Sequence, residues 1–342
     1  MVDLQPVELV AVIVAIPDQT DPRVLVIGEP GGVPRLSSGP LLADHRSLQY
    51  AVRSWVRSQS GLDLGFVEQL YTFADRERTG PLGRVVSVSY LGLSSHLGLE
   101  EDARWRGWYE FFPWEDRRDL TDEEWLDRHV PLVAGLRAWA DSALPPLNST
   151  DPVDSTDQTD PLACASDSGR AWLGDARWER IASAYGLEGR PWAPENCLQR
   201  YELLWEAGLL PESTPGARTA AAARGWDDSL DLGARMLHDH RRILATGIAR
   251  LRAKIQYRPV VFELMPEEFT LGQLQLAVEA VAGTGVHKQN FRRIVESQQL
   301  VEETGRRARD TGGRPAMLHR FRREVLAERE VAGTKLPQPR AR

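Results

Sequence analysis

The chain has 342 residues, of which 42% are hydrophobic, a formal net charge of −7 and two cysteines. This length suffices for two domains with separate cores, and the wide spacing of Cys164 and Cys197 argues against a disulfide framework or a cysteine metal cluster. The longest apolar run, Leu9 to Ile16, is too short for a membrane span and follows acidic residues. We therefore expect neither a signal peptide nor a membrane anchor, and we expect a cytoplasmic protein.

The charge is unevenly distributed along the chain. Residues 287–342 contain fourteen Lys or Arg and seven Asp or Glu, a net charge of +7, which leaves −14 for residues 1–286. An overall negative charge argues against a nucleic-acid binder, but a basic C-terminal end is suited to an anionic partner.

The first third of the chain predicts strands around a helix. Apolar runs at 8–16 and 24–27 flank a turn and predict a hairpin, and β-rich runs follow at 68–73 and 85–93. Between them, residues 47–60 carry apolar side chains at helical spacing, with Gly61 as the stop. This order predicts an α/β/α sandwich.

The segment 47–62 resembles the signature helix of Nudix pyrophosphohydrolases without its carboxylates. That helix carries three clustered Glu residues for divalent cations that activate water, and such hard cations need anionic oxygen ligands. The corresponding positions here hold Ser54, Trp55, Val56, Ser58, Gln59, Gly61 and Leu62. The sequence therefore predicts a Nudix-like fold without a bound catalytic metal. Trp55 is interpreted as a core residue rather than a base-stacking one.

The middle of the chain predicts helices and a polar linker. Clustered aromatic residues between 105 and 114 indicate core packing or a subunit contact, and a helix is expected from Glu123 to Leu144. Residues 146–170 are rich in Pro, Ser, Thr and Asp and predict a flexible linker. Further helices are expected at 178–185, 196–207 and 236–257, the last with an apolar stripe that could join two domains or two subunits. His238 and His240 point in different directions on a helix, so a metal site there is not expected.

The segment 270–300 predicts a helix, a turn and a second helix. Thr270 and Gln273 have capping-box spacing, and Gly283 to Gly285 interrupt the helical pattern. On the second helix, one face is apolar and the other carries amide and basic side chains: Lys288, Gln289, Asn290, Arg292 and Arg293. Arg can recognise guanine, and Asn or Gln adenine, in the major groove. The alternative interpretation is an ordinary solvated helix face.

The next segment favours DNA binding over that alternative. Apolar residues at 300–301 and 317–318 enclose a glycine-containing stretch, which predicts a β-hairpin. The hairpin carries four arginines that could lie along phosphates or enter the minor groove: Arg306, Arg307, Arg309 and Arg314. Helix, turn, helix and basic hairpin together predict a winged helix-turn-helix that binds DNA.

Both halves together resemble the Nudix-related transcriptional regulators of NAD metabolism, the NrtR and NadQ group. The resemblance rests on 61–64, 68–73 and 83–90 for the Nudix core, and on 262–270, 290–293 and 313–321 for the DNA-binding domain. It covers residues 8–115 and 237–326, but not the helices between 178 and 210.

The resemblance implies a fold that is α/β plus α+β, with a Nudix-like sandwich and a winged helix-turn-helix joined by helices. The expected segments are a ligand-sensing domain (1–145), the linker (146–170), a helical connector (171–257), the DNA-binding domain (258–328) and a disordered tail (329–342). It also implies a homodimeric repressor of NAD biosynthesis genes that binds palindromic operator DNA. The effector would be ADP-ribose, NAD or ATP, and no other cofactor is required.

The candidate ligand-binding residues lie on the Nudix-like helix and in the loop after residue 73: Arg53, Asp75, Arg78 and Arg84. An Arg on a diphosphate forms a charge-assisted contact, whereas a solvated hairpin tip is the alternative for each residue. The chain is expected not to be an enzyme. Two alternatives remain open: a pyrophosphohydrolase with ligands displaced to Asp44, Asp63 or Glu68, and a scaffold that binds an acidic protein.

Overall fold

The computed structural model describes residues 6–29, 31–74, 78–80, 83–95, 97–99, 103–142, 167–227, 230–256, 259–308 and 315–322. The expected linker up to residue 166 and the expected tail at 329–342 lie outside these ranges. The chain divides into two compact units, one formed by Met1–Asp119 with Leu232–Arg340 and the other by Leu120–Asp231. The helices in the described ranges include none that is long and apolar enough to cross a membrane.

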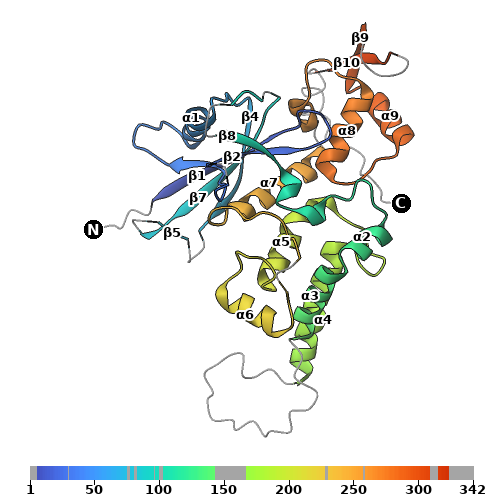
Figure 1. Ribbon diagram of the computed structural model, residues 1–342. Helices are drawn as coiled ribbons and strands as arrows, with labels where there is room; N and C mark the ends of the chain where they lie inside the picture. The colour runs from blue at the N-terminus through green and yellow to red at the C-terminus, as the bar shows by residue number, and fades with distance from the viewer. Residues whose placement is uncertain are drawn as a thin grey trace. The chain divides into compact units, whose positions relative to one another are not determined.

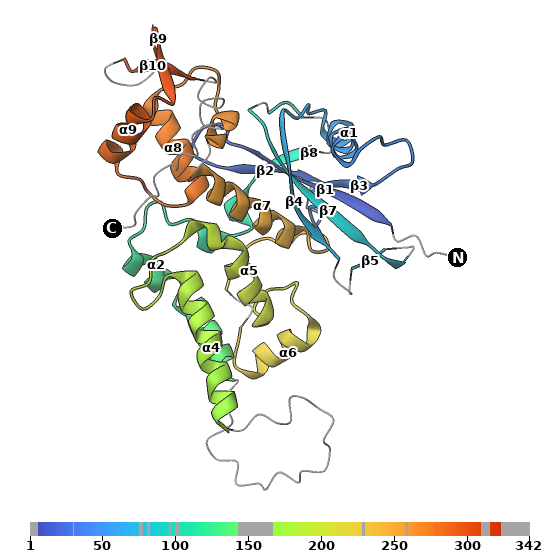
Figure 2. The ribbon, with the colours of Figure 1, turned by 180° about the vertical axis from the view of Figure 1, so that it is seen from behind.

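Within the described residues, the first unit contains a six-stranded sheet (Figures 1 and 2). The strand order is β4-β7-β1-β2-β8, and β3 also pairs with β1. β1 runs parallel to β7 and antiparallel to β2 and β3. The strands are β1 (Val7–Ala15), β2 (Arg23–Ile27), β3 (Ser37–Pro40), β4 (Phe66–Phe73), β7 (Val86–Leu93) and β8 (Ala103–Gly107), and the short strands β5 (Thr79–Gly80) and β6 (Gly83–Arg84) pair separately. The predicted hairpin at β1 and β2 is confirmed.

A helix covers each face of this sheet. Successive residues of a strand point to opposite faces, so β1 can pack against both helices. Leu9, Ala11 and Ile13 of β1 join the apolar cluster under α1 (Leu48–Ser60). The opposite face meets α7 (His240–Ile255), which contacts β1, β4 and β7. A Cβ at Gly247 of α7 would lie 2.8 Å from a methyl group of Val12, so this helix and β1 approach very closely. The predicted α/β/α sandwich is confirmed, and α7 forms one of its layers.

The ends of α1 follow directly from its sequence. The Ser47 side chain accepts a hydrogen bond from the backbone N–H of Tyr50, which caps the first turn. Gly61 has φ 73°, the left-handed conformation that ends many helices at a glycine. The predicted start and stop of the Nudix-like helix are confirmed.

The aromatic segment after β8 lies in the core of the first unit. Trp108, Phe111, Phe112 and Trp114 are fully buried around the short helices η1 (Trp108–Glu110) and η2 (Pro113–Glu115). The Nε–H of Arg241, on α7, donates to the carbonyl oxygen of Phe111 at 2.9 Å. The interpretation of this aromatic cluster as core rather than a base-stacking surface is confirmed.

The C-terminal part of the first unit is a winged helix. It consists of η4 (Val260–Leu264), α8 (Leu271–Ala282), α9 (Lys288–Ser297), β9 (Val301–Arg307) and β10 (Met317–Phe321). Thr270 and Gln273 form the predicted capping box at the start of α8. Phe262 stacks on Phe321 with ring centroids 4.2 Å apart, which fixes the hairpin against the helices.

The second unit is helical and contains α2 (Asp122–Arg128), α3 (Val130–Asp141), α4 (Asp167–Tyr185), η3 (Pro194–Asn196), α5 (Cys197–Glu206) and α6 (Pro215–Ala223). The single helix expected from Glu123 to Leu144 is wrong, because the chain leaves helical geometry at His129. Pro131 lies in the first turn of α3 and has no backbone N–H to continue α2. The helices expected at 178–185 and 196–207 are confirmed by α4 and α5.

Candidate nucleic-acid interface and effector site

The outer face of α9 carries the side chains predicted to read DNA. Phe291 and Val295 are buried against the rest of the winged helix. The opposite face is exposed and consists of Lys288, Gln289, Asn290, Arg292 and Arg293. Arg293 donates to the Oδ1 atom of Asn290 at 2.9 Å, so a guanidinium and an amide are held side by side. Such a pair offers both donors and an acceptor to a base edge.

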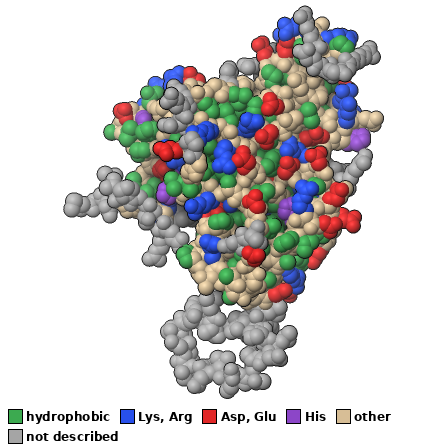
Figure 3. All heavy atoms as spheres, viewed as in Figure 1, with side chains coloured by type: hydrophobic (Ala, Val, Ile, Leu, Met, Phe, Trp, Pro, Cys, Tyr) green, Lys and Arg blue, Asp and Glu red, His purple; other side chains and the backbone are tan. Residues whose placement is uncertain are grey.

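Two of the four predicted hairpin arginines lie within the described residues, both on β9. Arg306 and Arg307 are exposed. Arg306 forms an ion pair with Glu268, and Arg307 donates to the carbonyl oxygen of Pro315 at 3.2 Å. Arg309 and Arg314 lie outside the described residues. Figure 3 shows Lys and Arg side chains along the edge of the molecule formed by the winged helix.

Gln59 and Trp55, at positions that the resemblance assigns to Nudix carboxylates, make packing contacts with β3. Gln59 of α1 accepts a hydrogen bond from Ser37 Oγ at 2.8 Å and donates to the carbonyl oxygen of Ser38 at 2.8 Å. Trp55 lies over Gly39, where a Cβ would overlap the indole ring, and its Nε1–H donates to Pro40 at 2.9 Å. These side chains attach the helix to β3, where Trp55 is packed but still partly exposed.

Two of the four ligand candidates are bound to the protein's own backbone. Arg53 donates to the carbonyl oxygens of Leu64 and Gly65, the latter at 2.9 Å. Arg84 is exposed and donates to the carbonyl oxygen of Ala74. Arg53 is thereby held against the segment that follows α1, and Arg84 against the residue that follows β4. Asp75 lies outside the described residues.

The remaining candidate, Arg78, is nearly buried and touches the start of α7. Its side chain is 10% exposed and pairs with Asp239, the residue immediately before the helix. The Nη1 atom of Arg78 is buried and has no hydrogen-bond acceptor. An unsatisfied buried donor costs about 1 to 3 kcal/mol. Arg78 therefore has donor capacity that none of the described residues uses.

His240, the first residue of α7, directly follows Asp239 and has a second donor that no described residue uses. Its Nδ1 atom accepts a hydrogen bond from the backbone N–H of Leu36 at 2.9 Å, so the ring proton belongs on Nε2. Nε2 is buried without a partner. Burial and then the charge of Arg78 lower the pKa of His240 to about 3, so the ring is neutral at physiological pH. The sequence showed only a His-Asp-His triplet and gave no sign of this environment.

The carboxylates considered as displaced metal ligands are separated. Asp44 is exposed on the loop before α1. Asp63 pairs with Arg57 at 2.5 Å, whereas Glu68 pairs with Lys254 and, at 3.3 Å, with Arg250. Among the described residues, no group of three or more His, Cys, Asp or Glu side chains is arranged to hold a metal ion.

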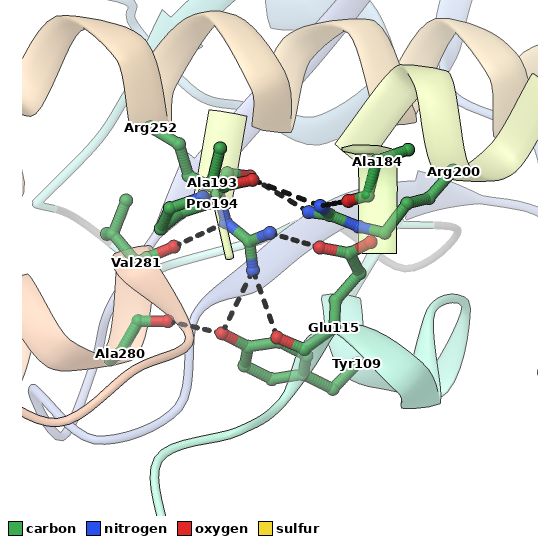
Figure 4. A network of polar contacts seen from close by, with 9 residues as sticks. All are labelled: Tyr109, Glu115, Ala184, Ala193, Pro194, Arg200, Arg252, Ala280 and Val281. Carbon is green, nitrogen blue, oxygen red and sulfur yellow. Dashed lines mark hydrogen bonds and ion pairs between the residues drawn. The ribbon is translucent and has the colours of Figure 1, made fainter. Parts of the chain in front are cut away.

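A buried ion pair connects α7 to η2, and the same arginine also contacts the winged helix (Figure 4). Arg252 of α7 pairs with Glu115 of η2, and both side chains are at most 1% exposed. The Nε–H of Arg252 donates to the carbonyl oxygen of Val281 on α8 at 2.9 Å. Burial raises the pKa of Tyr109, whose protonated hydroxyl donates to Ala280 at 2.7 Å. The same helix that covers the sheet therefore holds the end of α8.

Comparisons with known proteins agree with this architecture. Residues 261–321 match the family model described as the NrtR DNA-binding winged helix domain. The chain is 40% identical over 83 residues, 24% of its length, to the ADPR responsive transcriptional repressor NtrR of Acinetobacter baylyi. That match spans only 33% of the repressor's own length.

Two solved structures have a similar fold. The crystal structure of Shewanella oneidensis NrtR complexed with a 27mer DNA has a TM-score of 0.52 and 17% sequence identity, covering 98% of this chain and 99% of that one. A second crystal structure of Shewanella oneidensis NrtR has a TM-score of 0.51 and 17% sequence identity, covering 97% of this chain and 98% of that one. At this identity the likeness establishes the shared fold, a sandwich combined with a winged helix.

Proposed function

We propose that this NrtR-like chain is a DNA-binding transcriptional regulator that responds to an adenine nucleotide. The observation that carries the proposal is the exposed amide and guanidinium face of α9, within the residues that match the NrtR DNA-binding winged helix domain. A helix of this kind enters the major groove and reads base edges, while basic residues of the hairpin contact phosphates. Because DNA is the partner, the protein acts in the cytoplasm.

ADP-ribose is the effector that the comparison with the Acinetobacter baylyi repressor favours, because that protein is described as ADPR responsive. NAD and ATP remain in the proposal as adenine nucleotides that carry phosphate groups. Arg78 is the central residue of the proposed effector site, and Arg53, Asp75 and Arg84 stay as further candidates from the sequence. Unused donor capacity at Arg78 supports this assignment.

The regulator is proposed to bind its nucleotide without hydrolysing it. Gln59 and Trp55 hold α1 against β3 at positions where Nudix enzymes carry metal-binding carboxylates. Glu68 and Asp63, the nearest alternatives, are paired with cations, which would have to be displaced before either carboxylate could bind a metal. A pyrophosphohydrolase with displaced ligands is the second candidate.

Repression of NAD biosynthesis genes by a homodimer is the expected biological setting. A two-fold dimer places two recognition helices about one helical turn of DNA apart, which matches a palindromic operator. A nucleotide alters DNA affinity only if it binds one arrangement of the dimer better than another, and about 1 to 3 kcal/mol of coupling is sufficient.

The experiment that tests the proposal is a salt-titrated mobility shift on DNA from upstream of NAD biosynthesis genes, with and without ADP-ribose, NAD or ATP. We expect specific binding that one nucleotide changes. Arg292→Ala should weaken specific binding by about tenfold or more, the loss of one good base contact. Arg57→Ala removes an exposed cation from the sandwich and should leave DNA affinity unchanged.

Two results would redirect the assignment. If the wild-type protein shows no preference for any operator, the DNA-binding proposal fails, and the result favours the alternative of a scaffold that binds an acidic protein. If ADP-ribose is converted to products in the presence of Mg²⁺, the pyrophosphohydrolase candidate replaces the non-hydrolysing sensor. Product analysis after long incubation therefore accompanies the binding assay.

A further inference from the structure

Two buried N–H donors at the start of α7, one from His240 and one from Arg78, have no acceptor among the described residues. Arg78 pairs through one guanidinium nitrogen with Asp239 and leaves Nη1 unused. His240 is 1% exposed, and its Nε2 atom is also unused. The two side chains belong to the same region, because Arg78 pairs with Asp239, the residue that directly precedes His240.

The position of His240 is fixed from two sides. The backbone N–H of Leu237 donates to Pro34 at 2.8 Å, and the N–H of Leu36 donates to His240 Nδ1 at 2.9 Å. The segment 34–36 therefore holds the imidazole so that its remaining N–H cannot turn toward another protein group without breaking the Leu36 hydrogen bond. A ring held in this way is a rigid donor.

The charges around these donors select an anionic acceptor. Arg35 directly precedes Leu36, whose N–H binds His240, and Arg78 pairs with Asp239, so two guanidinium groups and one carboxylate belong to this region. The start of a 16-residue helix adds the positive end of its dipole. The two N–H donors require a group that accepts two hydrogen bonds, and the positive charge favours an anion. Phosphate oxygens meet both requirements.

We propose that Arg78 and His240 form an oxyanion subsite that binds phosphate oxygens of the nucleotide effector. This inference rests on the proposed effector function and adds His240, which no sequence motif indicated, to the site. It also places the effector against the first residue of α7, the helix whose Arg252 holds α8. The bound phosphate thus acts directly on the helix that joins the sandwich to the winged helix.

The test compares two substitutions of His240 that distinguish the role of its Nδ1 atom from the role of its Nε2 atom. In His240→Asn, the amide oxygen can still accept from Leu36 but the distal donor is lost, whereas His240→Gln returns an N–H near the Nε2 position. ADP-ribose, inorganic pyrophosphate and adenosine are titrated calorimetrically against each full-length protein. Arg57→Ala, which removes an exposed cation on α1, is the charge control.

We expect His240→Asn to weaken ADP-ribose and pyrophosphate binding by about tenfold, and His240→Gln to regain part of that loss. Adenosine has no phosphate, so its binding should not change in either variant, and Arg57→Ala should bind all three probes as the wild type does. If His240→Asn does not fold, Arg78→Lys keeps the positive charge beside Asp239 but removes Nη1, and the same loss is expected.

The outcomes distinguish the subsite from the regulator. Equal ADP-ribose affinity of wild type and His240→Asn overturns the subsite while leaving the regulator proposal intact. Binding of neither ADP-ribose nor pyrophosphate to the wild type also overturns it. Binding of pyrophosphate that depends on His240, in a protein without operator preference, supports the subsite although the regulator proposal fails.

Discussion

At Gly283 the backbone of α8 ends against three other groups. The residue has φ 71°, and a Cβ there would overlap the carbonyl oxygen of Glu115 and lie 2.7 Å from an Arg252 nitrogen and 2.9 Å from the Tyr109 hydroxyl. Its own carbonyl oxygen accepts from the N–H of Arg117 at 2.7 Å. A side chain at this position would force the helix away from the sandwich.

We therefore predict that Gly283→Ala lowers the free energy of unfolding by about 2 kcal/mol or more, from the strained φ and the overlap together. Gly285→Ala is the matched control, because its nearest neighbour, the Arg118 carbonyl oxygen, is 3.4 Å away and its φ is not in the left-handed region. Urea denaturation of both variants checks the difference. Equal stability of the two would contradict the close contact at Gly283.

His240 predicts a pH dependence of stability. Its pKa is about 3 in the folded protein and 6.5 in an unfolded chain, so the unfolded state binds more protons between these values. The stability that this residue contributes is complete above pH 6.5 and is lost as pH falls. At pH 5 the loss amounts to about 2 kcal/mol.

Comparison with His240→Asn isolates this effect from the carboxylates, which titrate in both proteins. We expect the wild type to lose about 2 kcal/mol more than the variant between pH 7.5 and pH 5. Denaturant titrations across this range give the two curves. Parallel curves would mean that the ring is not buried in its neutral form.

On the scale of elements, α7 has two structural roles. Through Gly247 it packs on β1, and through Arg252 it contacts η2 and the end of α8. Removing one partner of a buried charge pair is strongly destabilising, because the remaining buried charge keeps its desolvation cost without a compensating charge. The pair between Arg252 and Glu115 is therefore a sensitive point of this connection.

The prediction is a strong coupling between these two side chains. Glu115→Gln should destabilise the protein by about 3 kcal/mol or more, because Arg252 remains charged in the core. The double variant Glu115→Gln with Arg252→Met should be less destabilised than the sum of the single variants, by about 2 kcal/mol. Chemical denaturation of the four proteins of this cycle measures the coupling, and simple additivity would show that the pair does not act as a unit.

The sequence predicted those elements whose signals are local. Ser47 and Gly61 bound α1, and Thr270 with Gln273 begins α8, because caps depend on neighbouring residues. The apolar stripe of α7 was also visible. What it packs against was not, because Val12 and Gly247 are brought together by the fold.

The candidate sites differ in the same way. The exposed face of α9 could be read from helical spacing, and the structure exposes all five residues that were named. His240 could not be found, because its hydrogen bond to Leu36 joins residues 204 positions apart. Burial of Arg252 with Glu115 also depends on segments 137 positions apart. Polar groups whose role is set by long-range packing leave no local pattern.

On the scale of the whole molecule, the second unit is an insertion in the first. The first unit is formed by Met1–Asp119 and Leu232–Arg340, and its core contacts join the two segments: Arg241 with Phe111, and the backbone N–H of Ala234 with Glu110 at 2.8 Å. The helices of the second unit have their own core, in which Arg200 stacks on Trp192 at 3.7 Å. Each unit therefore contains the interactions that a separate fold requires.

We predict that replacing residues 120–231 with a flexible linker of about ten Gly and Ser residues leaves the first unit folded. Because α7, the sandwich and the winged helix all belong to that unit, the shortened protein should retain operator and ADP-ribose affinities within about threefold of the full chain, a change of less than 1 kcal/mol. Circular dichroism, a mobility shift and calorimetry measure folding and the two affinities. A folded but inactive product would assign the helical insertion a direct part in DNA or nucleotide binding, whereas an unfolded product would show that the first unit depends on it for stability.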